Sequence, residues 1–147
     1  MYTRFEKQCH QFIEWFESLK PETSTLEALR EYYAEDVTFK SPLHQARGIE
    51  EYAKLYSLWF DKYPGLKFKL TDYVMDDTKR VLFCHWTLTY HDNNGGKTKQ
   101  LCGMGYTRFN KELKVDYDEA LFDAKVVYED IPILGWFLKL IRDAFLK

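Results

Sequence analysis

The sequence has no hydrophobic run of the roughly 20 residues that a bilayer-spanning helix needs. Its first ten residues, MYTRFEKQCH, lack the apolar stretch and the small-residue cleavage site of a signal peptide. Cysteine is scarce: Cys9, Cys84 and Cys102 are an odd number and contain no C-x-x-C pair. These absences argue against a disulfide framework and a zinc site, and they predict a cytoplasmic protein.

An excess of basic residues is also missing. The 21 Lys and Arg against 23 Asp and Glu give a formal net charge of -2, and the basic residues are spread along the chain. Nucleic acid is therefore disfavoured as a partner, because no basic stripe is present to release phosphate counterions. His85 and His91 lie six residues apart on one predicted strand, roughly 20 Å, too far to share a metal. We expect no metal site and no cofactor.

Apolar side chains, by contrast, are abundant. Hydrophobic residues make up 46% of the 147 residues and aromatic residues 18%. This is enough apolar surface to fold one domain spanning 1–147, and the length leaves little room for a second core. Aromatic rings also line concave ligand sites, so their abundance is a first indication of a pocket.

The hydrophobic spacing changes from helical to strand-like along the chain. Steps of three and four residues predict a helix over 5–19, a second helix opened by the capping box Ser24-x-x-Glu27, a third over 49–63 and a last from Pro132. Alternation predicts a short strand, 36–40, and then four strands, 68–75, 80–91, 98–109 and 113–122. Because helices precede strands without βαβ alternation, we expect an α+β fold with an antiparallel meander.

Four segments carry a family resemblance. They are residues 32–39 (YYAEDVTF), the proline corner 41–44 (SPLH) running to Arg47-Gly48, residues 105–109 (GYTRF) and residues 131–136 (IPILGW). Together with the element order they are similar to the nuclear transport factor 2-like superfamily, which includes ketosteroid isomerases and SnoaL-like polyketide cyclases. The resemblance implies a cone: a bent sheet wrapped around the N-terminal helices, an apolar cavity open at one end, and a homodimer formed through the outer face of the sheet.

The residues that the resemblance aligns with known catalytic groups are altered. The general base of the isomerases falls at Ser41, whose hydroxyl cannot act as a base near neutral pH. Their tyrosine and acidic donors fall at or near Trp15 and at Gly105, and the His and Asp of SnoaL-like relatives fall at Asp118 and Ala120. Steroid isomerisation by that mechanism is therefore disfavoured.

Asp118 is the main candidate for chemistry. Alternation over the last strand places Asp116, Asp118, Ala120 and Phe122 on one face. If this face points into the cavity, Asp118 is a buried carboxylate with a raised pKa and a catalytic role. The alternative is an exposed acid near the turn at Lys111.

His44 is the second catalytic candidate, because an imidazole beside the proline corner titrates near neutral pH or orients a ligand hydroxyl. A corner histidine bonded to backbone is the alternative. Gly103 and Gly105, which have no side chains, either leave free volume at the base of the cavity or allow the sheet to curl. The residues predicted to line the pocket are Trp15, Tyr33, Tyr56, Trp59, His85, Gly103, Gly105 and Phe122. For the aromatic members, an ordinary place in the core is the competing interpretation.

Two functions are consistent with these residues. The first is a SnoaL-like protein that binds a small hydrophobic molecule without ketosteroid isomerase chemistry. The second is an isomerase, cyclase or hydratase acting on a lipophilic substrate, with Asp118 as acid or base and His44 or His85 as its partner. For the apolar C-terminal helix, packing against the sheet or a partner subunit is favoured over a membrane surface.

Overall fold

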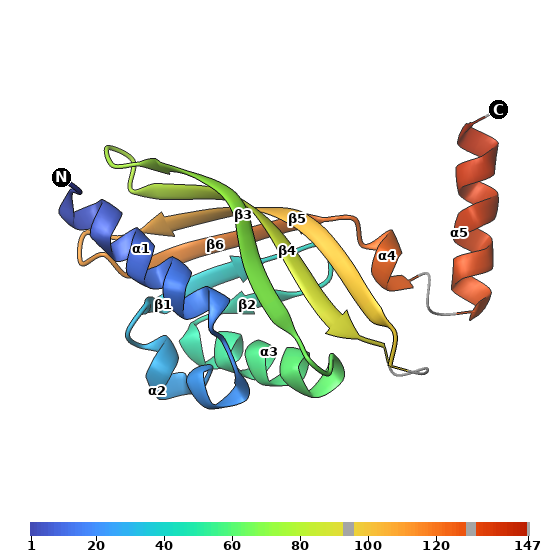
Figure 1. Ribbon diagram of the computed structural model, residues 1–147, viewed down its shortest axis with the longest axis horizontal. Coiled ribbons are helices and arrows are strands. Elements are labelled where there is room, and N and C mark those ends of the chain that lie inside the picture. The colour runs from blue at the N-terminus through green and yellow to red at the C-terminus, as the bar shows by residue number, and fades with distance from the viewer. Residues whose placement is uncertain (93–95, 129–131, 147) are drawn as a thin grey trace.

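A six-stranded sheet curls around two helices that cover its inner face (Figure 1). The computed structural model describes residues 1–92, 96–128 and 132–146. The helices are α1 (Arg4–Glu17), α2 (Leu26–Leu29), α3 (Ile49–Lys62), α4 (Lys125–Tyr128) and α5 (Pro132–Phe145), with a 3-10 turn at Pro21–Thr23. The strands are β1 (Tyr33–Lys40), β2 (Gln45–Arg47), β3 (Lys67–Asp76), β4 (Val81–His91), β5 (Thr98–Phe109) and β6 (Val115–Phe122).

The predicted α+β class and the meander are confirmed. The sheet order is β2-β1-β6-β5-β4-β3, with β3 to β6 paired antiparallel. One pairing corrects the antiparallel prediction, because β1 runs parallel to β6 and the sheet is therefore mixed. This pairing closes the cone, since it brings the chain that follows the N-terminal helices beside the last strand of the meander (Figure 1).

The second helix differs most from its prediction. Its N-cap is Thr25, whose hydroxyl accepts a hydrogen bond from the Ala28 amide at 3.3 Å, and it is only one turn long. The Lys114 ammonium donates to the carbonyls of Arg30 and Glu31, at 2.9 and 2.6 Å, just after this turn. A distant side chain thus satisfies two carbonyls that follow the helix end at Leu29, and β1 starts at Tyr33. The short β2 and α4 were not predicted.

The core lies between the inner face of the sheet and helices α1 and α3. Helix α1 begins with a capping box, in which Thr3 accepts from the Glu6 amide and Glu6 accepts from the Thr3 amide. The largest fully buried side chains come from three helices and four strands, namely Cys9, Leu29, Tyr33, Val37, Ile49, Tyr52, Tyr56, Leu82, Phe109 and Val115. The helices therefore present a continuous apolar surface to the sheet.

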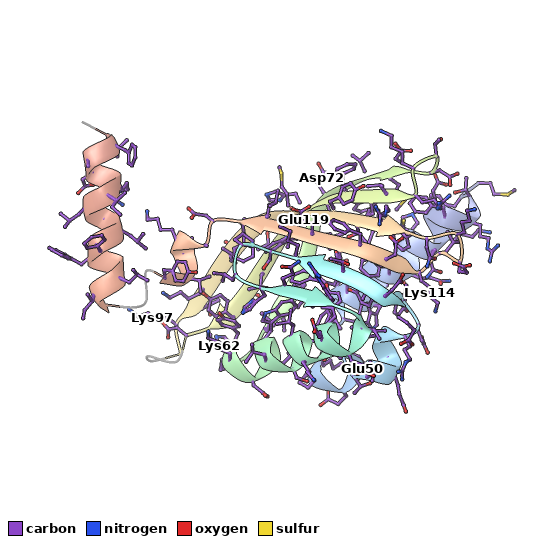
Figure 2. The ribbon with its side chains drawn as sticks, turned by 180° about the vertical axis from the view of Figure 1, so that it is seen from behind. Glu50, Lys62, Asp72, Lys97, Lys114 and Glu119 are labelled. Carbon is purple, nitrogen blue, oxygen red and sulfur yellow. The ribbon has the colours of Figure 1, made fainter. Side chains whose placement is uncertain are left out.

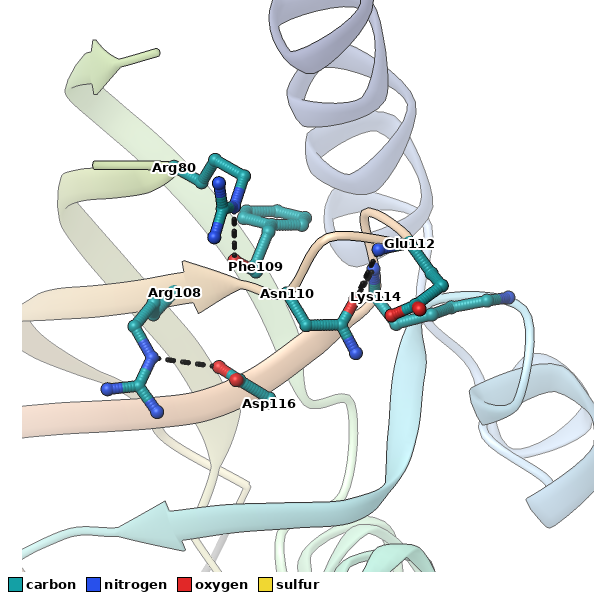
Figure 3. A network of polar contacts seen from close by, with 7 residues as sticks. All are labelled: Arg80, Arg108, Phe109, Asn110, Glu112, Lys114 and Asp116. Carbon is teal, nitrogen blue, oxygen red and sulfur yellow. Dashed lines mark hydrogen bonds and ion pairs between the residues drawn. The ribbon is translucent and has the colours of Figure 1, made fainter. Parts of the chain in front are cut away.

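An irregular pairing sets the direction of the β6 side chains. Arg108 pairs with Tyr117 but Phe109 pairs with Val115, so Asp116 is an extra residue between the two pairs. Asp116 bonds the Arg108 guanidinium at 2.9 Å, as Figure 3 shows. In the adjoining turn, the Asn110 carboxamide accepts from the amides of Glu112 and Lys114, both at 3.0 Å (Figure 3). The predicted common face of Asp116 and Asp118 is thus wrong, because the bulge separates them.

The C-terminal helix α5 stands apart from the sheet, beyond α4 (Figure 1). Its large apolar side chains are exposed, among them Ile133 at 82%, Trp136 at 61% and Phe145 at 87%. Packing of this helix on the sheet is therefore not observed, since α1 and α3 already cover the inner face. In the described part of the chain no helix is both long and apolar enough to cross a membrane. Residues 93–95, in the connection between the predicted strands 80–91 and 98–109, lie outside the described residues, as do Ile131 of the last motif and Lys147.

Candidate functional site

A cavity of about 130 Å³ lies between α3 and the inner face of the sheet. Its wall runs from α1 to Val127 of α4, which Figure 1 shows at opposite ends of the sheet. Eleven of the lining side chains are aromatic, namely Phe12, Phe16, Phe39, Tyr52, Tyr56, Trp59, Tyr63, Phe68, Trp86, Tyr90 and Phe122. Helix α3 supplies Tyr52, Tyr56 and Trp59, whose spacing of four and three residues places them on one side of the helix.

Asp118 points into this cavity. Its carboxylate accepts hydrogen bonds from the Tyr52 hydroxyl at 2.7 Å and the Thr107 hydroxyl at 2.9 Å. Burial raises the pKa of Asp118, and the two hydrogen bonds, which stabilise the charged form, oppose that rise. Thr107 lies directly opposite Asp118 in the β5–β6 pairing, so the same register that turns Asp116 outward holds Asp118 inward.

Three tyrosines extend the polar group behind Asp118. The hydroxyls of Tyr33 and Tyr56 are 2.8 Å apart, and the Tyr33 ring packs against Tyr52 with a centroid distance of 4.9 Å. Burial raises the pKa of all three hydroxyls, and the negative charge of Asp118 raises each further. The tyrosines therefore stay neutral near pH 7; Tyr52 donates to Asp118, and the Tyr33 and Tyr56 hydroxyls bond each other.

His44 also lines the cavity, at the proline corner. Its Nδ1 accepts from the Trp59 indole N–H at 3.4 Å. Burial lowers the pKa of His44, and the positive charge of Lys62 lowers it further. Lys62 itself is the last residue of α3, labelled in Figure 2. The imidazole is therefore neutral at physiological pH, and its Nδ1 is already engaged.

Ser41, which stands where the resemblance places a general base, is committed to the corner backbone. Its hydroxyl accepts from the amides of Leu43 at 3.3 Å and His44 at 3.0 Å. It also donates to the His44 carbonyl at 3.3 Å. Ser41 thus shapes the corner and supplies no base.

Six of the predicted site residues reach the cavity surface, namely Asp118, His44, Tyr56, Trp59, Gly105 and Phe122. Gly105 has a direct role in keeping the space open. A Cβ at this position would come within 2.8 Å of the Cys84 sulfur. Burial and, to a lesser extent, the negative charge of Asp118 raise the pKa of the Cys84 thiol to about 12, so this wall carries a neutral thiol.

The other four predicted residues, Trp15, Tyr33, His85 and Gly103, do not line the cavity in the described chain. The Trp15 indole donates to the Thr23 carbonyl at 3.1 Å, and its ring stacks on Tyr32. Tyr33 is only 2% exposed and lies behind Tyr52 and Tyr56.

His85 and Gly103 are excluded from the cavity for different reasons. His85 is exposed on the outer face of β4, where its ring bonds the Thr71 hydroxyl. Gly103 faces inward, but the Trp86 ring fills the space that a side chain would take, and a Cβ there would overlap it. Gly103 therefore provides room for a tryptophan and no space for a ligand.

Sequence reasoning missed the two partners of Asp118. Tyr52 had a usable signal, because it precedes Tyr56 by four residues on the same helical face. Thr107 had none, since its contact with Asp118 depends on the register of two strands. Among the described residues, no cluster of three or more His, Cys or acidic side chains is arranged to hold a metal ion.

Residues 12–117 match the SnoaL-like domain family. The chain belongs to this family. No curated protein matches the chain. The fold also matches solved structures at low identity, and these show the shared nuclear transport factor 2-like fold alone.

Three of these structures indicate the range of proteins built on the fold. A candidate SnoaL-like polyketide cyclase from Jannaschia sp. CCS1 is 11% identical, with a TM-score of 0.71 over 88% of this chain and 94% of its own. TsrD from Streptomyces laurentii is 14% identical, with a TM-score of 0.70 over 90% and 98%. A candidate isomerase of the SnoaL-like family from Agrobacterium tumefaciens is 19% identical, with a TM-score of 0.62 over 80% and 95%.

Proposed function

We propose that this SnoaL-like protein binds a small lipophilic molecule in the cavity. The observation that supports this most is the composition of the wall, in which eleven aromatic rings surround one inward carboxylate. Ligand sites in proteins are typically apolar concavities with a few placed polar groups, and this wall has that character. Its volume of about 130 Å³ suits a molecule of one ring, or the leading end of a longer one.

Filling the cavity tests this proposal. Ala120 lines the cavity, whereas its neighbour Leu121 is 59% exposed on the other face. Ala120→Phe should abolish the thermal stabilisation that small aromatic ligands give the wild-type protein, and Leu121→Phe should preserve it. Equal stabilisation of both variants would show that these ligands bind elsewhere.

The second candidate is an enzyme that uses Asp118 as an acid or base on the bound molecule. The inward carboxylate with its raised pKa favours this reading, because general acids and bases need pKa values moved toward neutrality. His44 is the available partner within the wall, since His85 lies on the outer face. Mass analysis of each ligand after incubation distinguishes the two: Asp118→Asn should stop any conversion, and a ligand recovered unchanged from the wild-type protein contradicts catalysis.

We also propose that two copies associate through the outer face of the sheet. Val74, Phe83, Met104 and Leu121 are exposed there on four neighbouring strands, with Val74 paired to Phe83 and Met104 to Leu121. Exposed contiguous apolar surface of this kind is typical of protein interfaces. Light scattering should give twice the mass of one chain for the wild-type protein and a monomer for Met104→Glu. A monomeric wild-type protein at micromolar concentration would rule this interface out.

We assign the protein to a reducing compartment such as the cytoplasm. Its three cysteines are free, as expected where disulfides do not persist. Cell fractionation with an antibody against the chain tests this assignment.

A further inference from the structure

The described cavity wall carries one inward carboxylate and no basic side chain to balance it. Asp118 points inward, whereas the neighbouring Glu119 accepts from the Tyr117 hydroxyl on the outer face. No Lys or Arg is among the described residues that line the cavity. The nearby base Lys62 is exposed, and its ammonium lies over the Tyr63 ring, 5.6 Å from the centroid. On the outer face, by contrast, Asp116 has the Arg108 guanidinium as a partner.

Asp118 retains unused capacity to accept hydrogen bonds. Each of its partners, Tyr52 and Thr107, has a single hydroxyl hydrogen and directs it to a different carboxylate oxygen. Two carboxylate oxygens offer about four acceptor positions, so about two are left over. Because Asp118 lines the cavity, a ligand donor can occupy them.

The aromatic rings beside Asp118 present carbon rather than polar atoms. The Tyr56 hydroxyl is bonded to Tyr33, the Tyr52 hydroxyl to Asp118 and the Trp59 indole N–H to His44. Tyr52 lies 5.0 Å from Tyr56 and 6.4 Å from Trp59 between ring centroids. The faces of such rings carry partial negative charge and attract cations.

We infer that the preferred ligand of this cavity is a small lipophilic amine, bound as an ammonium ion that donates to Asp118 and rests against the rings of Tyr52, Tyr56 and Trp59. The inference depends on the proposed binding function. An anionic ligand would place its charge beside Asp118 without a basic side chain to offset the repulsion. A neutral ligand gains the apolar contacts but leaves the carboxylate without a counter-ion.

The test uses three probes with the same ring and different charge, namely benzylamine, benzyl alcohol and benzoate. Isothermal titration calorimetry at pH 7 should give a dissociation constant for benzylamine at least about ten-fold lower than for benzyl alcohol, and no binding of benzoate. In Asp118→Asn, benzylamine should weaken to the affinity of benzyl alcohol, which itself should change little. Asp116→Asn is the matched control and should keep the wild-type order.

The outcomes separate the two proposals. If benzyl alcohol binds the wild-type protein as tightly as benzylamine, the amine assignment is overturned and the binding function stands. If Asp118→Asn keeps the ten-fold preference, Asp118 is not the counter-ion. If none of the probes binds, the cavity is not a site for ring-sized ligands and both proposals fail. Circular dichroism shows whether each variant folds. If one does not, the order of the three dissociation constants in the wild-type protein still decides the amine assignment.

Discussion

The inner and outer faces of the sheet place side chains of the same type in different surroundings. On β6, Asp116 lies outside and bonds an arginine, whereas Asp118 lies inside and bonds only hydroxyls. Cys102 is exposed, whereas Cys84 is part of the cavity wall. On the outer face, the aspartate is paired with a base and the cysteine is exposed to water. On the inner face, the carboxylate has no basic partner and lies among aromatic rings. This difference is the basis for proposing the inner face as the ligand site.

The largest difference in stability should come from removing the tyrosine hydroxyl that bonds a carboxylate on each side of the sheet. Tyr52→Phe deletes a buried hydrogen bond to a carboxylate and should cost about 1.5–3 kcal/mol of unfolding free energy. The Tyr117 hydroxyl donates to Glu119 at 3.0 Å on the outer side, and Tyr117→Phe should cost no more than about 1 kcal/mol. Urea denaturation of both variants measures the contrast, and equal losses would mean that the two environments do not differ.

Alanine substitutions at two neighbouring residues of β5, one on each face, should give the next largest difference in stability. In Gly103→Ala the new Cβ overlaps the Trp86 ring and lies 2.6 Å from the Leu121 carbonyl oxygen, so we expect a loss of about 1–3 kcal/mol in unfolding free energy. Met104 is 63% exposed, and Met104→Ala should change stability by about 0.5 kcal/mol or less in the monomer. Thermal denaturation at low protein concentration is the measurement. A harmless Gly103→Ala would show that Trp86 can move aside.

The two aspartates should affect the pH dependence of stability differently. Since the pKa of Asp118 is raised on folding, the native state holds its proton longer than the unfolded state, and stability falls as pH rises from the ordinary aspartate range toward the raised value. The groups around Asp118 are Tyr33, Tyr52, Tyr56, Cys84 and Thr107, all neutral there. Asp118→Asn should remove this fall in stability.

Asp116→Asn should instead lose only the partly exposed ion pair with Arg108, about 0.2–1 kcal/mol near pH 7. Chemical denaturation of both variants between pH 4 and 7 compares them. A wild-type profile unchanged by Asp118→Asn would show that Asp118 does not titrate in this range.

The smallest expected effect concerns the cysteines, which should differ only in their rates of alkylation. Cys102 is exposed, whereas burial raises the pKa of Cys84 and of Cys9 to about 12. Iodoacetamide at pH 8 should therefore label Cys102 well before the other two, because the thiolate is the reacting form. Peptide mass spectrometry over time reports the order. Early labelling of Cys84 would indicate that the cavity opens readily to water.

Local patterns predicted the elements of this protein but not the contacts that make the site. Period-two spacing located β3 to β6 within a few residues, and helical spacing placed α1 and α3. The bulge at Asp116 escaped prediction because it depends on how two strands pair, and the alternation rule then grouped Asp116 with Asp118. The resemblance predicted the cone, but it could not show that Tyr52 and Thr107 hold Asp118.

The most direct test of this account is a carbon-13 NMR titration of the Asp118 side-chain carboxyl, with and without benzylamine. The free protein should titrate above the ordinary aspartate value of about 3.9, and saturating benzylamine should move the midpoint downward, because a bound cation favours the carboxylate. A midpoint at the ordinary value that benzylamine leaves unchanged would contradict the claim that the inner face holds a buried carboxylate for a cationic ligand.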